Sequence, residues 1–474
     1  MHTEKKSIKF YYISIITILI LTSASFIFKW VPIEVLRYIS IFILLLQIWN
    51  EIKSKHQLFL ISPLFLLSFS ALVFFSFLQG MTLNLHEPVA FSEVLVSIGS
   101  DAERYVAAFG CVTLATHILL VFVIKIKIKA EKKIWIKDNQ FIYNFFIFFI
   151  IILTFVNVYC FYNLPNTLAI ISVPLRHLLP PLQAFMLLLL IRKTFINGER
   201  FRLLIVLFFC IIFIGMFAVH EGKTPVLLFT IVILYWMKLT RITIKKIFVC
   251  SFIITLVGIT GLQLISVMRA PEGSVKMFIS ESGTTQIKKN IPLLLRAPAL
   301  KLLYRQTDTI HCLNKVLNDH SEDVFVLSEQ FFWLKGLVPR IIWQEKPNLS
   351  EGQVYTQKYC RHNNHLNHYS SITLLGQPFI KGGNTGLFLN LGFLIFGLTG
   401  ITWLTRERFS LSALSVAALS PWLVDMDQNF ILYIANATKF FLIILPLIII
   451  VGLSEKNKHI WKFINLLNLR EKTK

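Results

Sequence analysis

Three histidines, His362, His365 and His368, are spaced by three residues within the longest polar segment of the chain. Imidazole titrates near neutral pH, so one of them could act as a general base that takes a proton from an attacking hydroxyl. Zinc motifs have other spacings and usually include a thiolate or carboxylate ligand, so the pattern predicts no metal site. A solvated polar loop without chemistry is the alternative interpretation.

Cations lie in the same polar segment. Arg269 directly follows an apolar run, and Arg340 lies close to Trp343 and Lys346 in a stretch bounded by prolines. Guanidinium groups hold phosphate oxygens through paired hydrogen bonds, and an indole ring offers a flat face on which a sugar can stack. Trp343 is therefore a candidate sugar-stacking residue. An arginine that reaches ordinary lipid headgroups is the alternative for Arg269.

Other cations occupy positions from which they could reach the same anion. Arg305 lies in an amphipathic region, residues 291–317, where it could pair with Asp308. The region is either a helix that lies on the membrane surface with a basic face or a face that contacts an anionic lipid-linked substrate. Arg176 and Lys223 stand at the ends of apolar runs. Five residues are therefore candidates for binding a substrate diphosphate: Arg176, Lys223, Arg269, Arg305 and Arg340.

The elements that must position these side chains are apolar helices. Hydrophobic residues make up 55% of the 474 residues and charged residues 15%, a composition that excludes an ordinary soluble domain. Apolar runs of about 20 residues recur, which is the length of helix that crosses the hydrocarbon core. We expect an all-α, polytopic membrane protein with about twelve transmembrane helices. The predicted spans are 10–28, 31–50, 58–79, 103–124, 141–162, 175–191, 203–219, 225–240, 247–267, 385–404, 409–424 and 430–452.

The spans divide the chain into three parts. Residues 1–267 hold the first nine predicted helices, and residues 385–474 hold the last three with a tail. Residues 268–384 form one large loop between the ninth and the tenth helix. This loop carries most of the candidate site residues, so we expect the chemistry to be concentrated there.

The distribution of positive charge predicts the sidedness. Short connections on one side hold 27 of the 47 Lys and Arg residues, as cytoplasmic loops do. Both termini are therefore predicted to be cytoplasmic, and the large loop is predicted to face the periplasm. The first apolar run is long and lacks a small-residue cleavage site, which favours a helix over a signal peptide. The net charge of +22 indicates contact with membrane lipid, and we expect no nucleic-acid partner.

Two further features leave alternatives open. Cys312 and Cys360 both lie in the predicted outside loop, where disulfides persist, and they form either a bridge or two unpaired small hydrophobic residues. Lys439 lies well inside the last predicted span. An ionisable residue at that depth is functional or paired, and Asp425 and Asp427 are possible partners.

The topology and two local segments resemble the Wzy-type O-antigen (oligosaccharide repeat unit) polymerases and the wider group that includes the O-antigen ligases. The local carriers are the sequence VPRIIWQEKP over residues 338–347 and the glycine-rich GGNTG over residues 382–386. The resemblance covers the whole arrangement of spans, both termini and the large loop before the last three helices.

The resemblance implies an inverting, metal-independent glycosyl transfer on undecaprenyl diphosphate-linked oligosaccharides in the bacterial inner membrane. It implies no cofactor, and it implies a chain-length regulator protein as a partner. Outside-facing arginines hold the diphosphate in such enzymes, and Arg269 matches one of those positions. Lys223 stands where another arginine is usual, and the paired arginine-to-glycine motifs of some polymerases do not occur at their expected spacing. A loop histidine assists the acceptor hydroxyl, which leaves His362, His365 and His368 as catalytic candidates.

Other functions remain open from the sequence. The chain could be the ligase that transfers finished polymer onto a lipid core, because sequence barely separates ligase from polymerase. It could be a transporter (flippase) of lipid-linked oligosaccharides, although transporters usually show internal repeats and midplane binding residues. An outward-acting acyltransferase and a structural membrane component are the remaining possibilities.

Overall fold

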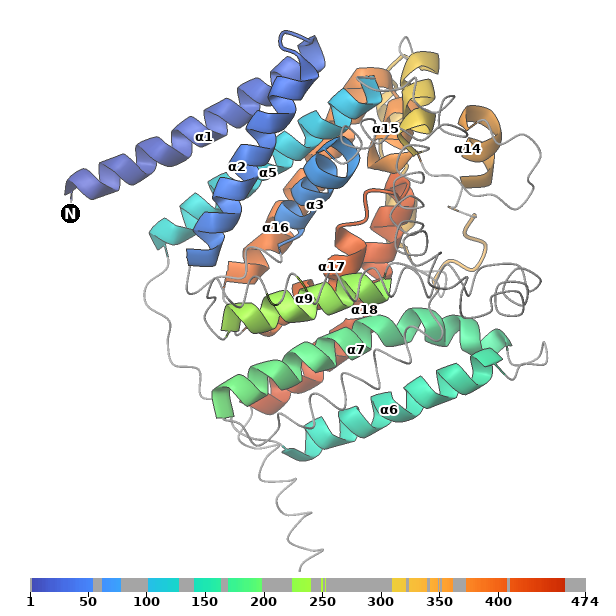
Figure 1. Ribbon diagram of the computed structural model, residues 1–474. Coiled ribbons are helices and arrows are strands. Elements are labelled where there is room, and N and C mark those ends of the chain that lie inside the picture. The colour runs from blue at the N-terminus through green and yellow to red at the C-terminus, as the bar shows by residue number, and fades with distance from the viewer. Residues whose placement is uncertain are drawn as a thin grey trace, which may run out of the picture.

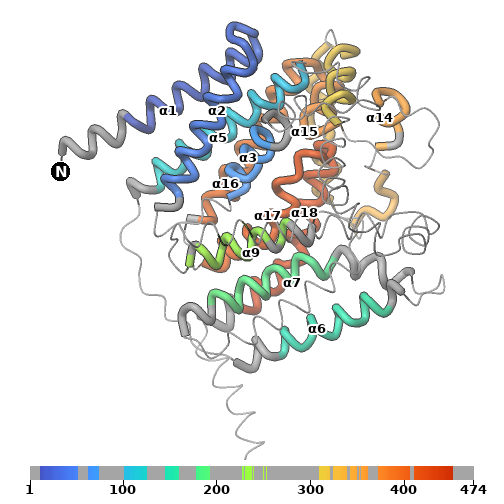
Figure 2. The backbone as a smooth tube through the Cα atoms, viewed as in Figure 1, coloured from blue at the N-terminus to red at the C-terminus, as the bar shows by residue number. Residues whose placement is uncertain are grey.

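The computed structural model consists of helices packed around two apolar cores (Figure 1, Figure 2). Among the described residues there are helices, turns and connections, but no strand. The described residues are 2–53, 62–77, 101–127, 140–162, 169–197, 224–239, 249, 252, 309–320, 324–338, 342–347, 349, 352–360, 372–406 and 410–456.

Ten of the predicted spans overlap described helices, whose bounds are α1 His2–Phe28, α2 Ile33–Lys53, α3 Pro63–Phe69 with the π-helix η2 Ser70–Phe77, α5 Asp101–Lys127, α6 Gln140–Tyr162, α7 Ala169–Asn197, α9 Thr224–Leu239, α16 Gly383–Trp403, α17 Leu411–Leu423 and α18 Phe430–Lys456. Five contain an apolar stretch long enough to cross a membrane, and four shorter apolar helices accompany them. The predicted spans 203–219 and 247–267 lie outside the described residues, apart from residues 249 and 252. The chain is therefore a helical membrane protein, while the total of about twelve spans stays a prediction.

One core joins the N-terminal helices. The helices α1, α2 and α5 pack together with α3 and η2 over buried Leu19, Leu44, Leu72 and Leu114. The helix α3 begins where Ser62 caps it, since the Ser62 hydroxyl accepts a hydrogen bond from the Phe65 amide at 3.3 Å. This cap fixes Ser62 on the inner side of the bundle, close to α5.

The second core joins the remaining helices. The helix α17 lies at its centre, buried from Ala413 to Leu423, and packs against α7, α9 and α18. The helix α16 contacts both α5 and α3, and it therefore links the two cores. Polar side chains on α5 and α16 are positioned against each other by this contact.

The described parts of residues 309–380 gather at one end of the bundle, beside the first turns of α2, α5, α16 and α18 (Figure 1). We call this the loop end. These parts contain residues 309–319, which are helical, and the short helices η6 Leu327–Glu329, α13 Leu334–Leu337, α14 Gly352–Tyr359 and α15 Thr373–Ile380. A disulfide joins Cys312 to Cys360 across a separation of 48 residues, which decides between the two alternatives left open by the sequence.

The end of the predicted loop is packed into the helix bundle. Every residue from Thr373 to Phe379 in α15 is buried. The Gln377 side-chain oxygen accepts a hydrogen bond from the Ile431 amide at 3.0 Å, which satisfies one of the free amides at the start of α18. The short helix α15 therefore belongs structurally with α16 and α18.

A buried glutamine fastens the loop to α16. Gln330 donates to the Val326 and Lys381 carbonyls at 3.0 and 2.7 Å, and its oxygen accepts from Asn390 at 3.0 Å. The side chain fits because Gly382 and Gly386 carry no Cβ, since a Cβ there would lie 2.8 Å from Gln330 Nε2 or Oε1 respectively. We call these residues the Gln330 clasp.

Replacing Gly386 with alanine is expected to lower stability by about 1–3 kcal/mol, because the new methyl group overpacks the clasp. It would also lie 2.9 Å from the Pro378 carbonyl oxygen, which is backbone and cannot rotate away. The matched control is Gly392→Ala on the same helix, where no atom lies within 4 Å. Thermal unfolding in detergent should show a lower midpoint for Gly386→Ala than for the unmodified protein, and an unlowered midpoint for Gly392→Ala. Equal midpoints for the two variants would argue against the clasp.

Candidate functional site

The structure describes two of the residues selected from the sequence. Arg176 lies within α7, where its backbone is helical, and Trp343 is half-buried in the stretch 342–347. The other candidates lie outside the described residues, and their roles stay predictions: Lys223, Arg269, Arg305, Arg340, His362, His365 and His368.

Lys346 serves a structural contact that the sequence did not indicate. Its ammonium group donates to the Gly336 and Val338 carbonyls at 3.3 and 2.6 Å, and the residue is buried. The Lys346 ammonium group is therefore held by backbone carbonyls of the same segment. The lysine closes the end of α13, which positions the stretch that carries Trp343.

A cluster of charged residues lies at the loop end of α2 and α5. Arg37 of α2 forms an ion pair with Glu103 of α5, and both side chains are buried. The Lys29 ammonium lies 2.7 Å from the Asp101 carboxylate in a second, more exposed pair. Taking charges out of water is costly unless they are paired, so this pairing fixes how α2 and α5 meet.

Arg104 is the next residue on α5 and lies near enough to Arg37 for the two positive charges to repel each other. Its Nε and Nη1 atoms are buried and make no hydrogen bond to any residue within the described ranges. A guanidinium group has five N–H donors, and burying such donors without hydrogen-bond acceptors is unfavourable. Arg104 is therefore the cation of this cluster that is best suited to accept an anionic ligand.

Tyr105 links the cluster to the glycine-rich segment. Its hydroxyl donates to the Asn384 side-chain oxygen at 2.5 Å, and its ring contacts Phe379 of α15 at 6.3 Å between centroids. The Ala102 amide also donates to the Asn314 side chain at 3.5 Å. We call Arg37, Glu103, Arg104, Tyr105 and Asn384 the Arg104 cluster. It brings α2, α5 and the start of α16 together at the loop end.

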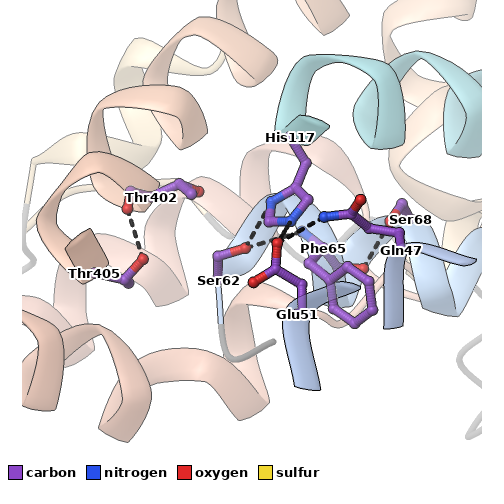
Figure 3. Close-up of polar contacts among 8 residues, drawn as sticks. All are labelled: Gln47, Glu51, Ser62, Phe65, Ser68, His117, Thr402 and Thr405. Atoms are coloured by element: carbon purple, nitrogen blue, oxygen red, sulfur yellow. Dashed lines mark hydrogen bonds and ion pairs between the residues drawn. The ribbon is translucent and has the colours of Figure 1, made fainter. Parts of the chain in front are cut away.

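Figure 3 shows a second polar cluster, which includes Glu51 near the end of α2 and His117 of α5. The Ser62 hydroxyl lies 3.1 Å from His117 Nδ1, and the Glu51 carboxylate lies 4.0 Å from His117 Nε2. Gln47 donates to the same Glu51 oxygen at 2.7 Å. All four side chains are buried. This His117 cluster could share a proton between an imidazole and a carboxylate.

The two clusters occupy the same pair of helices. Glu51 follows Arg37 on α2 by fourteen residues, and His117 follows Glu103 on α5 by the same number. Fourteen residues make four helical turns, about 21 Å of rise. The helices α2 and α5 therefore run in the same direction, with charged contacts near both ends of their shared length.

Lys439 has no carboxylate partner among the residues that the structure describes. Its ammonium group lies 4.6 Å from the centre of the Phe440 ring. Asp425 instead accepts a hydrogen bond from Gln428 at 2.7 Å, and Gln428 accepts one from Asn436 at 2.8 Å. Within the described residues neither Asp425 nor Asp427 forms an ion pair with Lys439, so the predicted pair is wrong, and the ammonium group instead contacts the Phe440 ring.

Both clusters have a signal in the sequence, although neither was among the predicted sites, which lie mostly in the long loop. Arg37, Arg104 and His117 are ionisable residues inside predicted apolar spans, which marks them as functional or paired. Arg37 precedes Glu51 by fourteen residues on one helix, and Glu103 precedes His117 by fourteen on another, which is the spacing of two contacts four turns apart. The pairing across helices joins residues far apart in the sequence, which no local motif reveals.

The chain matches no family model, no curated protein and no solved structure.

Proposed function

We propose that this membrane protein is a glycosyltransferase that polymerises undecaprenyl diphosphate-linked oligosaccharide repeat units. The product is O-antigen or a related surface polysaccharide, made on the periplasmic face of the bacterial inner membrane. The observation that carries the proposal is Arg104, a guanidinium with buried donors that have no partner among the described residues, at the loop end of the bundle. The Cys312–Cys360 disulfide supports an outside position for the loop, because disulfides persist outside the cytoplasm.

The proposed reaction needs an activated sugar and a base. The acceptor hydroxyl attacks the anomeric carbon of the donor glycan, and the bond from that carbon to the diphosphate oxygen breaks. The undecaprenyl diphosphate leaves with the electron pair, and the hydroxyl proton passes to a base, for which His362, His365 and His368 are the candidates. The leaving diphosphate gains negative charge, so fixed cations lower the barrier.

The cations proposed to meet the diphosphate come from several elements. Arg104 approaches from α5, and Arg269 and Arg340 are predicted to approach from the loop. A lipid carrier delivers its head at the membrane surface, which is where a cluster at the ends of helices can reach it. Trp343 comes shortly after Arg340 in the chain. It is half-buried, so part of its indole ring remains available to stack on a sugar.

Deletion of the gene tests the function directly. Surface polysaccharide resolved on a gel should then show lipid core that carries a single repeat unit, because the first unit is still ligated. Loss of a ligase would instead leave bare core with polymer on the carrier lipid. Loss of a flippase would leave no repeat unit at the surface. Either of these two patterns would contradict the proposal.

Replacing Arg269 or Arg340 with alanine should reproduce the single-repeat pattern in cells that contain normal amounts of the protein. The reason is that each of these guanidinium groups is predicted to bind the diphosphate. Immunoblots of the membranes check the amounts. Full-length ladders from both variants would reject these two arginines as part of the site.

The His117 cluster favours a second candidate function, transport of lipid-linked oligosaccharides. Buried ionisable residues inside spans mark proton relays in transporters, and His117 with Glu51 is such a pair. In that case His117→Gln would abolish surface repeat units altogether, as deletion of a flippase does. The polymerase proposal expects His117→Gln to retain at least the single-repeat product.

A further inference from the structure

The segment 324–338 has the properties of a membrane-inserted element, although the sequence places it in a polar loop. It contains η6 and α13, and it lies between the beginnings of α16 and α18. Gly336 packs so closely on α18 that an added Cβ would lie 2.9 Å from the Ile431 carbonyl oxygen. On the other side, the Gln330 clasp holds the segment against the first two turns of α16.

The contacts with α16 indicate how deep the segment would lie in the membrane. The rings of Phe331 and Trp333 lie 6.0 and 6.1 Å from the ring of Phe393. Phe393 is ten residues beyond Gly383, the first residue of a 21-residue candidate span. Ten residues of helix rise about 15 Å, which is about half of the hydrocarbon core. The segment therefore reaches the level of acyl chains if α16 crosses the membrane.

Its backbone is suited to that environment. Backbone groups at membrane depth must find partners inside the protein. Four amides in the segment donate to carbonyls three residues back, namely Glu329 to Val326, Gln330 to Leu327, Leu334 to Phe331 and Gly336 to Trp333, with lengths from 2.8 to 3.1 Å. The Gln330 side chain also donates to the Val326 carbonyl, and the Lys346 ammonium group donates to two further carbonyls, those of Gly336 and Val338.

The outward face of the segment is apolar. Val324, Leu327 and Leu334 are 82%, 60% and 46% exposed, and Phe331 is 40% exposed. This face continues onto α16 through the contact of Phe331 with Phe393, and Phe396 beyond it is 81% exposed. A large apolar surface that is continuous with the exposed face of a membrane span indicates lipid as its partner.

The charged side chains of the segment can reach the lipid headgroups at the membrane surface. Glu329 lies 3.7 Å from Lys381, just before α16 begins. The exposed Lys335 has a long side chain that can carry its ammonium group to the headgroups. The charged side chains therefore do not oppose insertion of the apolar ones.

We infer that residues 324–337 form a re-entrant element whose exposed apolar side chains contact the acyl chains of the leaflet at the loop end, beside α16. The partner is the bilayer itself. This inference depends on the chain being a membrane protein and does not depend on the proposed glycosyl transfer.

Nitroxide accessibility in reconstituted vesicles tests it. Single cysteines are introduced as Val324→Cys, Leu327→Cys and Leu334→Cys in full-length protein whose Cys111, Cys160, Cys210 and Cys250 are replaced by alanine, with the disulfide kept. The vesicles contain phosphatidylethanolamine and phosphatidylglycerol, and each label is relaxed by oxygen or by a water-soluble nickel complex. Phe396→Cys is the lipid-facing control, and exposed Asp319→Cys is the solvent control.

The inference expects a high ratio of oxygen to nickel accessibility at positions 327 and 334, equal to that at 396, and a low ratio at 319. Position 324 should give an intermediate ratio, because it begins the segment. Nickel accessibility at 327 and 334 equal to that at 319 would overturn the inference. So would labels at 327 and 334 that neither reagent reaches, since that result means a protein partner covers the face. The two positions are independent, so one variant that fails to fold leaves the other decisive.

Discussion

Arg37→Met is expected to lower the folding stability of the protein by about 3–5 kcal/mol, the usual cost of removing one partner of a buried ion pair. The variant keeps the aliphatic part of the side chain, so the loss comes from the charge. Glu103 is fully buried and would then lack its guanidinium partner on α2. Unfolding of the purified protein in mixed micelles, followed by circular dichroism, measures the change.

The double variant Arg37→Met/Glu103→Leu is the control for this prediction. It replaces both charges by apolar groups of similar size, which is often neutral or stabilising. We therefore expect it to recover most of the lost stability. A single variant as stable as the unmodified protein, or a double variant worse than the single one, would show that the ion pair does not join α2 to α5.

Arg104→Ala is expected to lower the rate of polymer formation by about 10²-fold, the typical loss when one fixed donor to a developing negative charge is removed. The buried Nε and Nη1 atoms of Arg104 have no partner among the described residues, so the change should affect folding less than Arg37→Met does. Polymer length distributions from membranes with equal amounts of protein measure the effect.

Two variants control for general loss of charge. Lys29→Ala removes a more exposed cation in the pair with Asp101, and the polymer should keep its normal length. Arg104→Lys keeps the charge but loses the forked donors, so an intermediate rate is expected. If Lys29→Ala and Arg104→Ala gave the same ladder as the unmodified protein, the cluster would have no part in the reaction.

The long helices could be predicted from the sequence because length and uniform apolarity suffice to identify them. The helices α1, α2, α5, α16 and α18 overlap their predicted spans, since each contains an apolar stretch long enough to cross the membrane. The short helix α15 was missed because eight residues are too few to show a span. It is also held in place by Gln377, whose side-chain oxygen accepts a hydrogen bond from the Ile431 amide, a contact that comes from tertiary packing.

The candidate site was predicted less well, for a related reason. Sequence patterns emphasised the long polar loop, and most of its candidate residues lie outside the described ranges. Arg104 and His117 stand in apolar spans. The charged or polar residues near them, Arg37 for Arg104 and Glu51 and Ser62 for His117, come from segments far away in the sequence. Lys346 shows the reverse case, because a lysine beside a tryptophan suggested substrate binding while its ammonium group binds backbone carbonyls.

The most direct test of the proposed function is reaction of the purified protein with a defined undecaprenyl diphosphate-linked repeat unit in vesicles. The proposal predicts a ladder of oligomers and one released undecaprenyl diphosphate for each glycosidic bond formed, with both products strongly reduced for Arg104→Ala. Repeat units that cross the bilayer without a new glycosidic bond, or that remain unchanged, would contradict it.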